Sequence, residues 1–377
     1  MILIVGGGLS GCLLAYRLAQ LKSPPAFLLI ESKANLCGNH TWSFHHSDLT
    51  EDTFRWMDPL ISRTWSQQEV RFLDHGRRFN QPYHSIKSEE LAQKIKKVLG
   101  DRVRLGTGVR SLSADEVILE TGERLAARVV FDARGTFNIP KEACGYQKFL
   151  GMDLELVEPH SIQNPIIMDA TCEQRDGFRF FYLLPWSNTQ LLIEDTRYSN
   201  EPDIDLTEYR EEILQLCKNH QWKIKKISRT ESAALPIPLQ SRAFHSPFNG
   251  PIEIGLKGGY FHLTTGYSLT YAAELAELVA NHLGTQPHWD GLSLKRELQP
   301  FNLQINSQSR FFALLNRMLF RAANPADRWI IFSRFYRLQE ELIFRFYRGN
   351  LKRLDQLRIL VGKPPVSVLR AIQQLNP

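Results

Sequence analysis

The first thirty residues alternate between fully apolar runs and short polar or glycine-rich breaks. Residues 2–5 (I-L-I-V) contain no polar position, which is typical of a parallel strand buried on both faces. Gly6 to Gly11 (G-G-G-L-S-G) follows, and residues 12–19 have the apolar spacing of a helix. A second apolar run at 27–30 ends at Glu31. This order predicts one βαβ unit with a glycine-rich turn between its first strand and its helix.

The next region mixes helical and strand patterns. Ser88 is placed to cap a helix over 88–99, because acidic residues follow it in the first turn. Residues 117–123 predict a hairpin. Residues 127–132 predict a further strand, with Asp132 at its end.

The middle of the chain changes to the alternating pattern typical of strands. Strands are expected at 165–171, 178–184 and 190–198. Residues 185–189 (P-W-S-N-T) predict a hairpin turn between the last two strands, and a helix is expected over 206–218.

The last third of the chain returns to patterns that belong with a nucleotide-binding domain and with helices. Residues 252–255 predict a late strand, which is followed by a loop at 264–266 and a helix over 269–282. After residue 290 we expect helix to the end of the chain.

Together these patterns predict an α/β (α+β) protein. We expect a Rossmann-type nucleotide-binding domain, an inserted antiparallel β-sheet domain for the substrate, and a helical C-terminal region. The expected ranges are 1–75, 85–145 and 248–290 for the nucleotide domain, 76–84 and 146–247 for the substrate domain, and 291–377 for the helical region.

Composition adds little to this prediction. The 377 residues are 43% hydrophobic and 23% charged, which is ordinary for a globular protein. The five cysteines are scattered and odd in number, which argues against a disulfide framework or a metal site and fits a reducing cytosol. The N-terminal apolar run leads straight into glycines, and no apolar run reaches about 18 residues. We therefore expect neither a signal peptide nor a membrane-spanning helix.

Charge matters more, because it is unevenly distributed. The net charge is +6, and residues 295–377 hold 15 Lys and Arg against 5 Asp and Glu. Eleven aromatic residues are interleaved with arginines over 301–350. No nucleic-acid recognition motif accompanies them, so we interpret this region as facing a membrane and expect a cytoplasmic protein, peripheral on the inner face of the cell membrane. The alternative is that the aromatic residues pack helix on helix while the arginines face water.

The glycine-rich turn is typical of a dinucleotide site. Its G-x-G-x-x-G motif follows a predicted strand and opens a helix. Glu31 lies twenty residues after Gly11, the last glycine of the motif. The glycines let the backbone approach a pyrophosphate, and Glu31 is placed to accept hydrogen bonds from ribose hydroxyls. An acid there favours FAD or NAD over NADP. The long β insertion and the loop at 264–266 favour FAD, while Asp132 is either a second contact or part of a simple turn. The candidate cofactor-binding residues are Gly6, Gly8, Leu9, Ser10, Gly11, Glu31, Asp132, Thr264, Thr265 and Gly266.

Two adjacent acids end an aliphatic run in the stretch L-L-I-E-D-T, and they are the candidate catalytic residues. Along a strand, Glu194 shares a face with Leu192 and Thr196, whereas Asp195 lies on the other face. Only one of the two acids therefore lines a given pocket, and periodicity does not choose between them. The alternative is that both acids face solvent.

Several segments, in order along the chain, resemble the bacterial lycopene β-cyclases. Two positions depart from the usual pattern of that family: Cys37 replaces a glycine and Leu263 replaces a proline. The segments are 38–45 (G-N-H-T-W-S-F-H), 165–171 (P-I-I-M-D-A-T), 192–196 (L-I-E-D-T), 262–269 (H-L-T-T-G-Y-S-L), 315–320 (L-N-R-M-L-F) and 357–365 (L-R-I-L-V-G-K-P-P).

The resemblance implies an isomerase that binds reduced FAD, with NADPH as the external reductant, and converts the ψ-ends of lycopene to β-ionone rings without net redox change. It also implies that Glu194 is the required acid. Either Glu194 or the reduced flavin delivers the first proton. Aromatic faces could stabilise the carbocation, and Trp42, Phe44, Trp186 and Tyr267 are candidates. The alternative for each of them is an ordinary core aromatic residue.

Two other function classes fit the same predicted fold. One is a redox flavoprotein of the aromatic hydroxylase or prenyl reductase type, which would consume NADPH with each product. The other is a non-catalytic lipid chaperone of the GDI type, which would not need Glu194.

Overall fold

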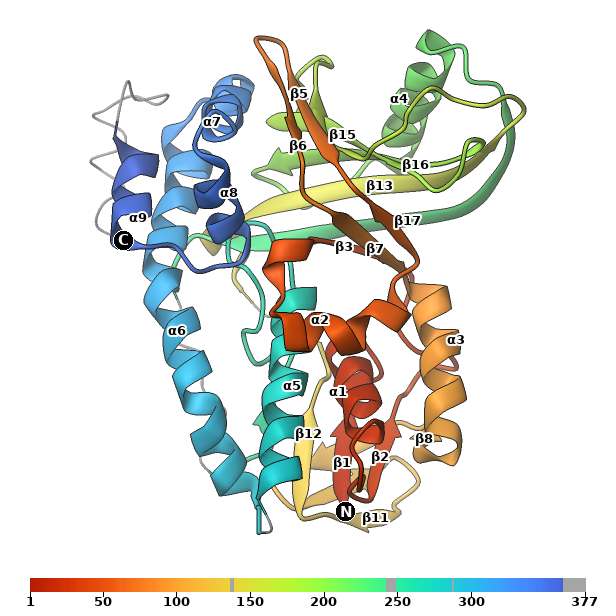
Figure 1. Ribbon diagram of the computed structural model, residues 1–377, viewed down its shortest axis with the longest axis vertical. Coiled ribbons are helices and arrows are strands. Elements are labelled where there is room, and N and C mark those ends of the chain that lie inside the picture. Colours follow the sequence, from red (N-terminus) through yellow and green to blue (C-terminus); the bar gives the residue numbers. More distant parts are fainter. Residues whose placement is uncertain (136–138, 242–248, 287, 362–377) are drawn as a thin grey trace.

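The computed structural model describes residues 1–135, 139–241, 249–286 and 288–361 (Figure 1). An α/β unit holds the N-terminus, and a large sheet lies above it in this view, with the C-terminal helices along one side of both. Segments from both ends of the chain therefore reach the region between the two units.

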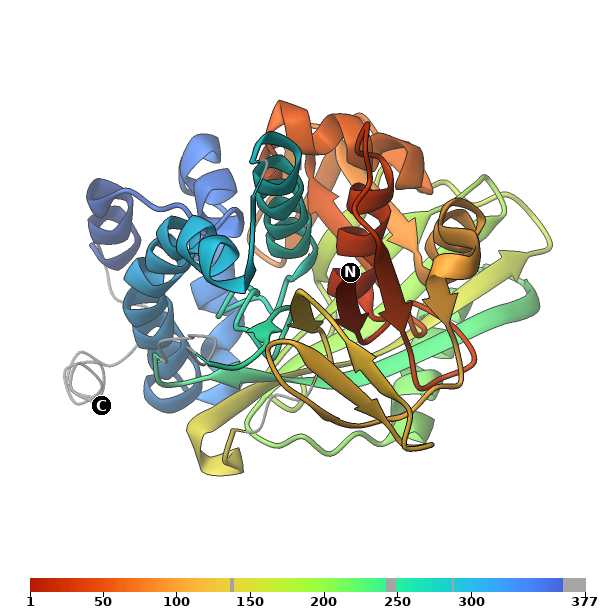
Figure 2. The same cartoon turned by 90° about the horizontal axis from the view of Figure 1, so that it is seen from below.

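The α/β unit is built on a parallel sheet with the strand order β18-β12-β1-β2-β8. Its first strand is apolar throughout because both faces are covered. Ile2 and Ile4 pack with the helices, while Leu3 and Val5 pack against a small three-stranded sheet, β11-β10-β9. Figure 2 shows the helices and this small sheet on opposite sides. The elements are β1 (Ile2–Val5), β2 (Phe27–Ile30), β8 (Val103–Arg104), β12 (Val129–Asp132), β18 (Ile252–Glu253), α1 (Leu9–Ala19), α3 (Ser88–Leu99), α5 (Leu269–Thr285), β9 (Val109–Leu112), β10 (Glu116–Leu119) and β11 (Arg124–Ala126).

The large sheet has seven strands in the order β17-β13-β16-β15-β14-β5-β6. It is antiparallel except for one parallel pairing, between β14 and β5. Alternate residues of β16 serve its two faces: Leu191 and Ile193 pack under α4, and Leu192 faces the C-terminal helices. The expected hairpin between the two central strands is present as β15 and β16. The elements are β5 (Gln68–Phe72), β6 (Gly76–Phe79), β13 (Cys144–Leu156), β14 (Ile166–Ala170), β15 (Phe178–Pro185), β16 (Gln190–Ser199), β17 (Ile224–Pro238) and α4 (Leu206–Asn219).

A small antiparallel sheet, β3-β7-β4, joins the two units. Trp42 of β3 pairs with Ile86 of β7, which places the segment around Thr41 beside the large sheet. The elements are β3 (Thr41–His45), β4 (Arg63–Trp65), β7 (Tyr83–Lys87) and α2 (Glu51–Met57).

The C-terminal region is helical, as predicted, through residue 360. The Arg77 guanidinium of β6 donates to the carbonyls of Tyr336 and Leu338, which fastens the α7–α8 connection to the large sheet. None of the helices within the described ranges has a window long and apolar enough to cross a membrane. The elements are α6 (Gly291–Arg317), a π-helical turn (Met318–Ala322), α7 (Arg328–Phe335), α8 (Glu340–Tyr347) and α9 (Arg353–Leu360).

The aromatic residues of this region are packed inside, as the helix-on-helix alternative predicted. All eleven are buried or partly buried, and most join one core cluster with the large sheet. Tyr336, at 1% exposure, and Phe312, at 2%, are examples. Packing against the large sheet therefore accounts for these rings, and contact of this region with a membrane stays a prediction.

Other sequence predictions differ in detail. Ser88 is the first residue of α3, and Lys87 occupies the N-cap position without a side-chain cap, so the predicted cap is wrong. The large sheet includes β5, which lies before residue 76 and so outside the range expected for the substrate domain. Strand β7 begins within the expected 76–84 segment but belongs to the small sheet. The helix expected beyond residue 361, and the end of the 357–365 segment, lie outside the described residues.

Candidate active site

The glycine-rich turn between β1 and α1 has the shape that a dinucleotide site requires. Gly6 has φ +112°, and a Cβ there would lie 2.7 Å from the Ala133 carbonyl. A Cβ on Gly11 would lie 2.0 Å from the Gly6 oxygen. Both glycines are thus needed for the packing of the turn itself. A Cβ on Gly8 would meet no atom within 4 Å, so Gly8 leaves the helix N-terminus open to a ligand.

The start of α1 is suited to an anion. Gly8 is the N-cap and offers no side-chain cap, and the first turn contains no acidic residue. The first N–H groups of the helix therefore keep their partial positive charge for a ligand. Glu31 lies at the end of β2, as expected, and accepts the Gly7 N–H at 2.5 Å and the Lys33 N–H at 2.7 Å. Ser10 is buried under the late loop, where a Cβ on Gly255 would lie 2.9 Å from its hydroxyl oxygen.

Asp132 ties the end of β12 to that late loop. Its carboxylate accepts from Arg134 Nε at 2.9 Å and from Lys257 Nζ at 2.5 Å. Burial alone would raise the pKa of Asp132, but hydrogen bonds from Arg134 and Lys257 lower it. The residue is therefore an ionised anchor at the carboxyl edge of the parallel sheet, beside the glycine-rich turn.

The loop at 264–266 is organised by a residue that the sequence did not single out, His262. Its Nδ1 accepts the N–H groups of Thr264 and Thr265, each at 3.2 Å, and its Nε2 donates to the Phe346 carbonyl at 2.8 Å. Burial lowers the pKa of His262 to about 4, so the ring is neutral and able to play both parts.

The contacts of His262 limit what the loop at 264–266 can offer to a ligand. The backbone N–H groups of Thr264 and Thr265 are engaged by His262 rather than free for a ligand. What remains is the N-terminus of α5, where Ser268 makes no side-chain cap, and the buried Thr264 hydroxyl, which has no partner among the described residues.

A cavity of about 580 Å³ extends from this loop between the large sheet and the C-terminal helices. Three of the four proposed aromatic residues line it, namely Trp42, Phe44 and Tyr267. Trp186 does not, and its indole N–H donates to Asp153 at 2.7 Å. The lining is mostly apolar, with aliphatic and aromatic side chains from β14, β15, β16, α6, α7 and α9. Such a cavity suits a hydrocarbon ligand.

Glu194 is the acid of β16 that lines the cavity. Its Oε1 accepts the Thr196 hydroxyl at 2.7 Å, from the residue two positions along on the same face. Burial is the largest cause that raises the pKa of Glu194, to about 8, and the charge of Glu231 is the second largest. A carboxyl group in this setting is protonated at neutral pH and can act as a general acid.

Glu231 of β17 is a second cavity-lining acid, and sequence reasoning missed it. Its own stretch, T-E-S-A-A-L, has no feature that marks it, since an acid in an alternating strand is ordinarily solvent-facing. Only the pairing of β13 with both β16 and β17 brings it near Glu194.

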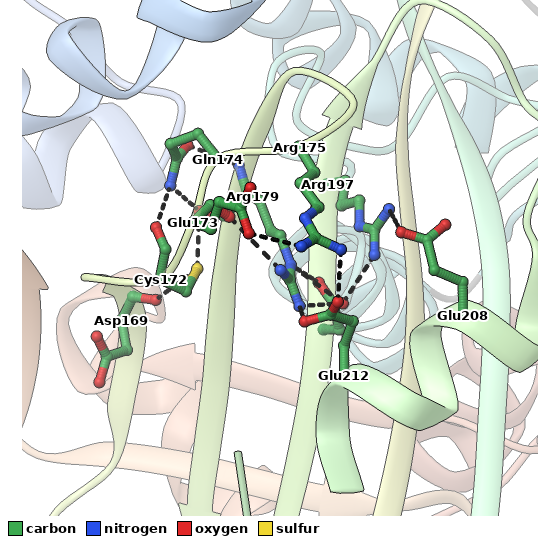
Figure 3. A network of polar contacts seen from close by, with 10 residues as sticks. Asp169, Cys172, Glu173, Gln174, Arg175, Arg179, Arg197, Glu208 and Glu212 are labelled. Atoms are coloured by element: carbon green, nitrogen blue, oxygen red, sulfur yellow. Dashed lines mark hydrogen bonds and ion pairs between the residues drawn. The ribbon is translucent and has the colours of Figure 1, made fainter. Parts of the chain in front are cut away.

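The structure separates Asp195 from this site. Asp195 does not line the cavity, and its carboxylate accepts from Arg179 Nη2 at 2.9 Å and Arg197 Nη2 at 3.1 Å. Figure 3 shows these two arginines and the acids of α4, Glu208 and Glu212, which bind their outer edges. The network lies on the α4 face of the sheet and serves to hold strands and helix together.

Comparisons with known proteins agree with this geometry. The model of the family described as lycopene cyclase protein matches residues 2–373. The lycopene beta-cyclase of Pantoea ananas is 40% identical over 375 residues, which cover 99% of this chain and 97% of that protein. The lycopene beta-cyclase of a Paracoccus species is 38% identical over 377 residues, covering 99% and 96%.

Solved structures with the same fold are much more distant in sequence. A probable FAD-dependent monooxygenase of Pseudomonas aeruginosa, PqsL, matches with a TM-score of 0.60 and 16% identity, covering 89% of this chain and 99% of that one. A geranylgeranyl bacteriochlorophyll reductase-like protein of Thermoplasma acidophilum matches with a TM-score of 0.59 and 11% identity, covering 99% and 98%. These likenesses establish the fold.

Replacing Asp195 by Asn should destabilise the protein. The change leaves Arg179 and Arg197, with side chains 1% and 2% exposed, without their shared counter-charge. Each arginine then keeps only one partly exposed acid of α4, Glu212 or Glu208. Because removing the buried partner of a buried ion pair is costly, we expect a loss of about 3 kcal/mol in the free energy of unfolding, measured by denaturant titration. Glu194→Gln on the same strand is the matched control and should lose far less. Equal unfolding midpoints for the two variants would contradict the assignment.

Proposed function

This chain belongs to the lycopene cyclase protein family, and from this premise we propose that it is a lycopene β-cyclase, an isomerase that closes the ψ-ends of lycopene to β-ionone rings. Closure at one end gives γ-carotene and closure at both gives β-carotene. The observation that carries the proposal is Glu194, a carboxylic acid protonated at neutral pH in the lining of an apolar cavity.

An alkene is a poor base, so the reaction requires a proton donor that is positioned at the double bond, still protonated at neutral pH and kept away from water. Glu194 donates its proton to C2 of the terminal double bond, which leaves a tertiary cation at C1. The C5=C6 double bond attacks C1, the positive charge moves to C5, and loss of the C6 proton completes the ring. Glu194 is suited to the first step because the apolar lining keeps water, a competing base, away from it.

The residues fit FAD as the cofactor. The open N-terminus of α1 would hold the pyrophosphate, and Glu31 the ribose hydroxyls. The N-terminus of α5 and the Thr264 hydroxyl, which has no partner within the described ranges, would meet the flavin end beside the cavity. Reduced FAD would supply negative charge that stabilises the carbocation, without net electron transfer. The reduced form as the active form, and NADPH as its external reductant, follow from the family resemblance.

Access from a membrane is supported by helix α9. Its leucines Leu354, Leu357 and Leu360 are 78%, 57% and 39% exposed. Leu360 also lines the cavity, so this apolar surface adjoins the place where a polyene would enter. Arg353 and Arg358 on the same helix are suited to anionic headgroups. We propose that α9 docks the protein on the inner face of the cell membrane.

Replacing Glu194 by Gln should abolish cyclisation. The amide keeps the shape but lacks the acidic proton, so we expect the rate to fall by at least about 100-fold. The test is anaerobic incubation with lycopene and chemically reduced FAD, with β-carotene and reductant both quantified. The wild type should form β-carotene without stoichiometric use of reductant. Glu155→Gln, on the same sheet but outside the cavity lining, is the control and should remain active. An active Glu194→Gln protein would refute the role of this acid.

Replacing Gly8 by Ala should weaken FAD binding without disturbing the fold. The added methyl meets no protein atom within 4 Å, but it enters the space in front of the α1 N-terminus. We expect an affinity loss of about tenfold or more, measured by flavin fluorescence titration. Gly76→Ala, where a Cβ makes only an ordinary contact at 3.6 Å, is the matched control. Unchanged affinity in Gly8→Ala would contradict this placement of the cofactor.

Replacing Leu354 and Leu357 together by Gln should weaken membrane association. Two leucines buried in lipid contribute a few kcal/mol, so vesicle binding should drop by at least about tenfold. The measurement is co-sedimentation with phosphatidylglycerol-containing vesicles. Val157→Gln is the control, because Val157 is 56% exposed at the far end of β13. Equal binding by the double variant and the control would remove α9 as the docking helix.

A further inference from the structure

Two carboxylic acids face each other across a strand that has no side chain between them. In the pairing of β13 with its neighbours, Gly151 lies opposite Glu194 of β16 on one side and opposite Glu231 of β17 on the other. Residues directly opposite in antiparallel strands point to the same face. Both glutamates therefore point to the cavity face, with only a glycine between them.

The glycine is what allows the two acids to approach. A Cβ on Gly151 would lie 3.1 Å from Glu231 Cγ and 3.5 Å from Glu194 Oε2. Glu231 thus comes closer to this position than an ordinary contact, and the Glu194 carboxylate lies in van der Waals contact with it. Both also line the cavity. The arrangement is a carboxyl pair and not two unrelated acids.

The partners of the two acids differ, which determines where a proton resides. Glu231 is 4% exposed and contacts the guanidinium of Arg229, with Nη2 and Oε1 3.3 Å apart. Glu194 is bound by the neutral Thr196 hydroxyl. Burial raises the pKa of Glu231, and Arg229 opposes that rise. Because two close carboxylates do not both ionise readily, the proton belongs on Glu194 and the charge on Glu231.

We propose that Glu194 and Glu231 act as one carboxyl pair that shares a single proton across Gly151, and that Glu231 is a positioning residue which keeps Glu194 in its acid form. This inference rests on the proposed cyclase function. It adds a residue to the reaction that acts through Glu194 and not on the polyene.

The pair also balances the protons of the reaction. When Glu194 donates its proton to C2, the pair carries two negative charges beside the substrate carbocation, which favours the charged intermediate. The proton released from C6 returns the pair to its one-proton state. One proton leaves and one returns, and no electron is transferred.

Other groups near the pair act on it from several elements, and none of them duplicates the charge of Glu231 inside the cavity. Arg229 is itself held by Asp153 at 2.7 Å. The charged and titratable groups that act on the pair are Arg229 from β17, Asp153 from β13, Tyr182 from β15, Tyr267 before α5, Glu89 from α3 through Arg229, and Asp195 from the opposite face of β16.

The test is the pH dependence of cyclisation in Glu231→Gln. Glu194 donates only when protonated, so the wild-type rate should hold below about pH 8 and fall above it. Removing the neighbouring negative charge should move this alkaline limb to lower pH, so the rate at pH 8 falls while the rate at about pH 6 is largely kept. Glu231→Asp retains the charge and should return the limb toward its wild-type position. Glu155→Gln should leave it in place.

A second readout does not depend on activity. Infrared difference spectroscopy follows the C=O band of the protonated carboxyl group, assigned by its loss in Glu194→Gln. This band should titrate at lower pH in Glu231→Gln than in the wild type. If Gln at 231 impairs folding, Glu231→Leu removes the same charge and should shift the band and the limb in the same direction.

The outcomes separate the two proposals. A wild type that cyclises lycopene, with limb and band unmoved in Glu231→Gln, overturns the carboxyl pair alone. A limb that shifts equally in Glu155→Gln also overturns it, since the effect is then not local. A wild type that forms no β-carotene refutes the cyclase function, while the infrared titration still decides whether the two acids share a proton.

Discussion

The strict alternation of side chains along β16 is the constraint on which the site depends. Glu194 must face a dry cavity and remain protonated, while its neighbour Asp195 forms ion pairs with two buried arginines on the opposite face. A slip of one residue in strand pairing would exchange these two environments and destroy both. The arginine network under α4 therefore does more than stabilise the sheet, because it fixes the register that presents Glu194 to the cavity.

The two units of the fold are held together by contacts between residues that are far apart in the sequence. His262 holds the loop before α5 and donates to the carbonyl of Phe346 in α8. Asn316 of α6 donates to the carbonyls of Leu263 and Pro238, so the same loop is also fixed to the end of β17. A cofactor bound at the α5 N-terminus and a substrate among the C-terminal helices would thus share one rigid wall.

Local signals were enough to predict the first elements of the α/β unit. The β1–α1–β2 order, the glycine-rich turn and Glu31 at the strand end were all confirmed, because each depends on neighbouring residues. The roles of His262 and Glu231 could not be predicted from neighbouring residues. His262 binds a carbonyl about 80 residues further along the chain, and Glu231 is placed by the register in which β17 pairs with β13. The aromatic C-terminal region was assigned to a membrane surface from composition, yet its rings form core, and the exposed apolar surface consists of leucines on α9.

At Gly151 the protein is less stable than it could be, and its proposed chemistry depends on that residue. A glycine inside a long, doubly paired strand is less favourable than alanine by about 0.5–1 kcal/mol, because its backbone loses more freedom on folding. Selection for heat resistance alone would therefore favour replacing it, and the replacement would crowd Glu231 and fill the space beside Glu194. Mutations designed to make this protein more heat-resistant should therefore leave Gly151 unchanged, even though it carries no functional group.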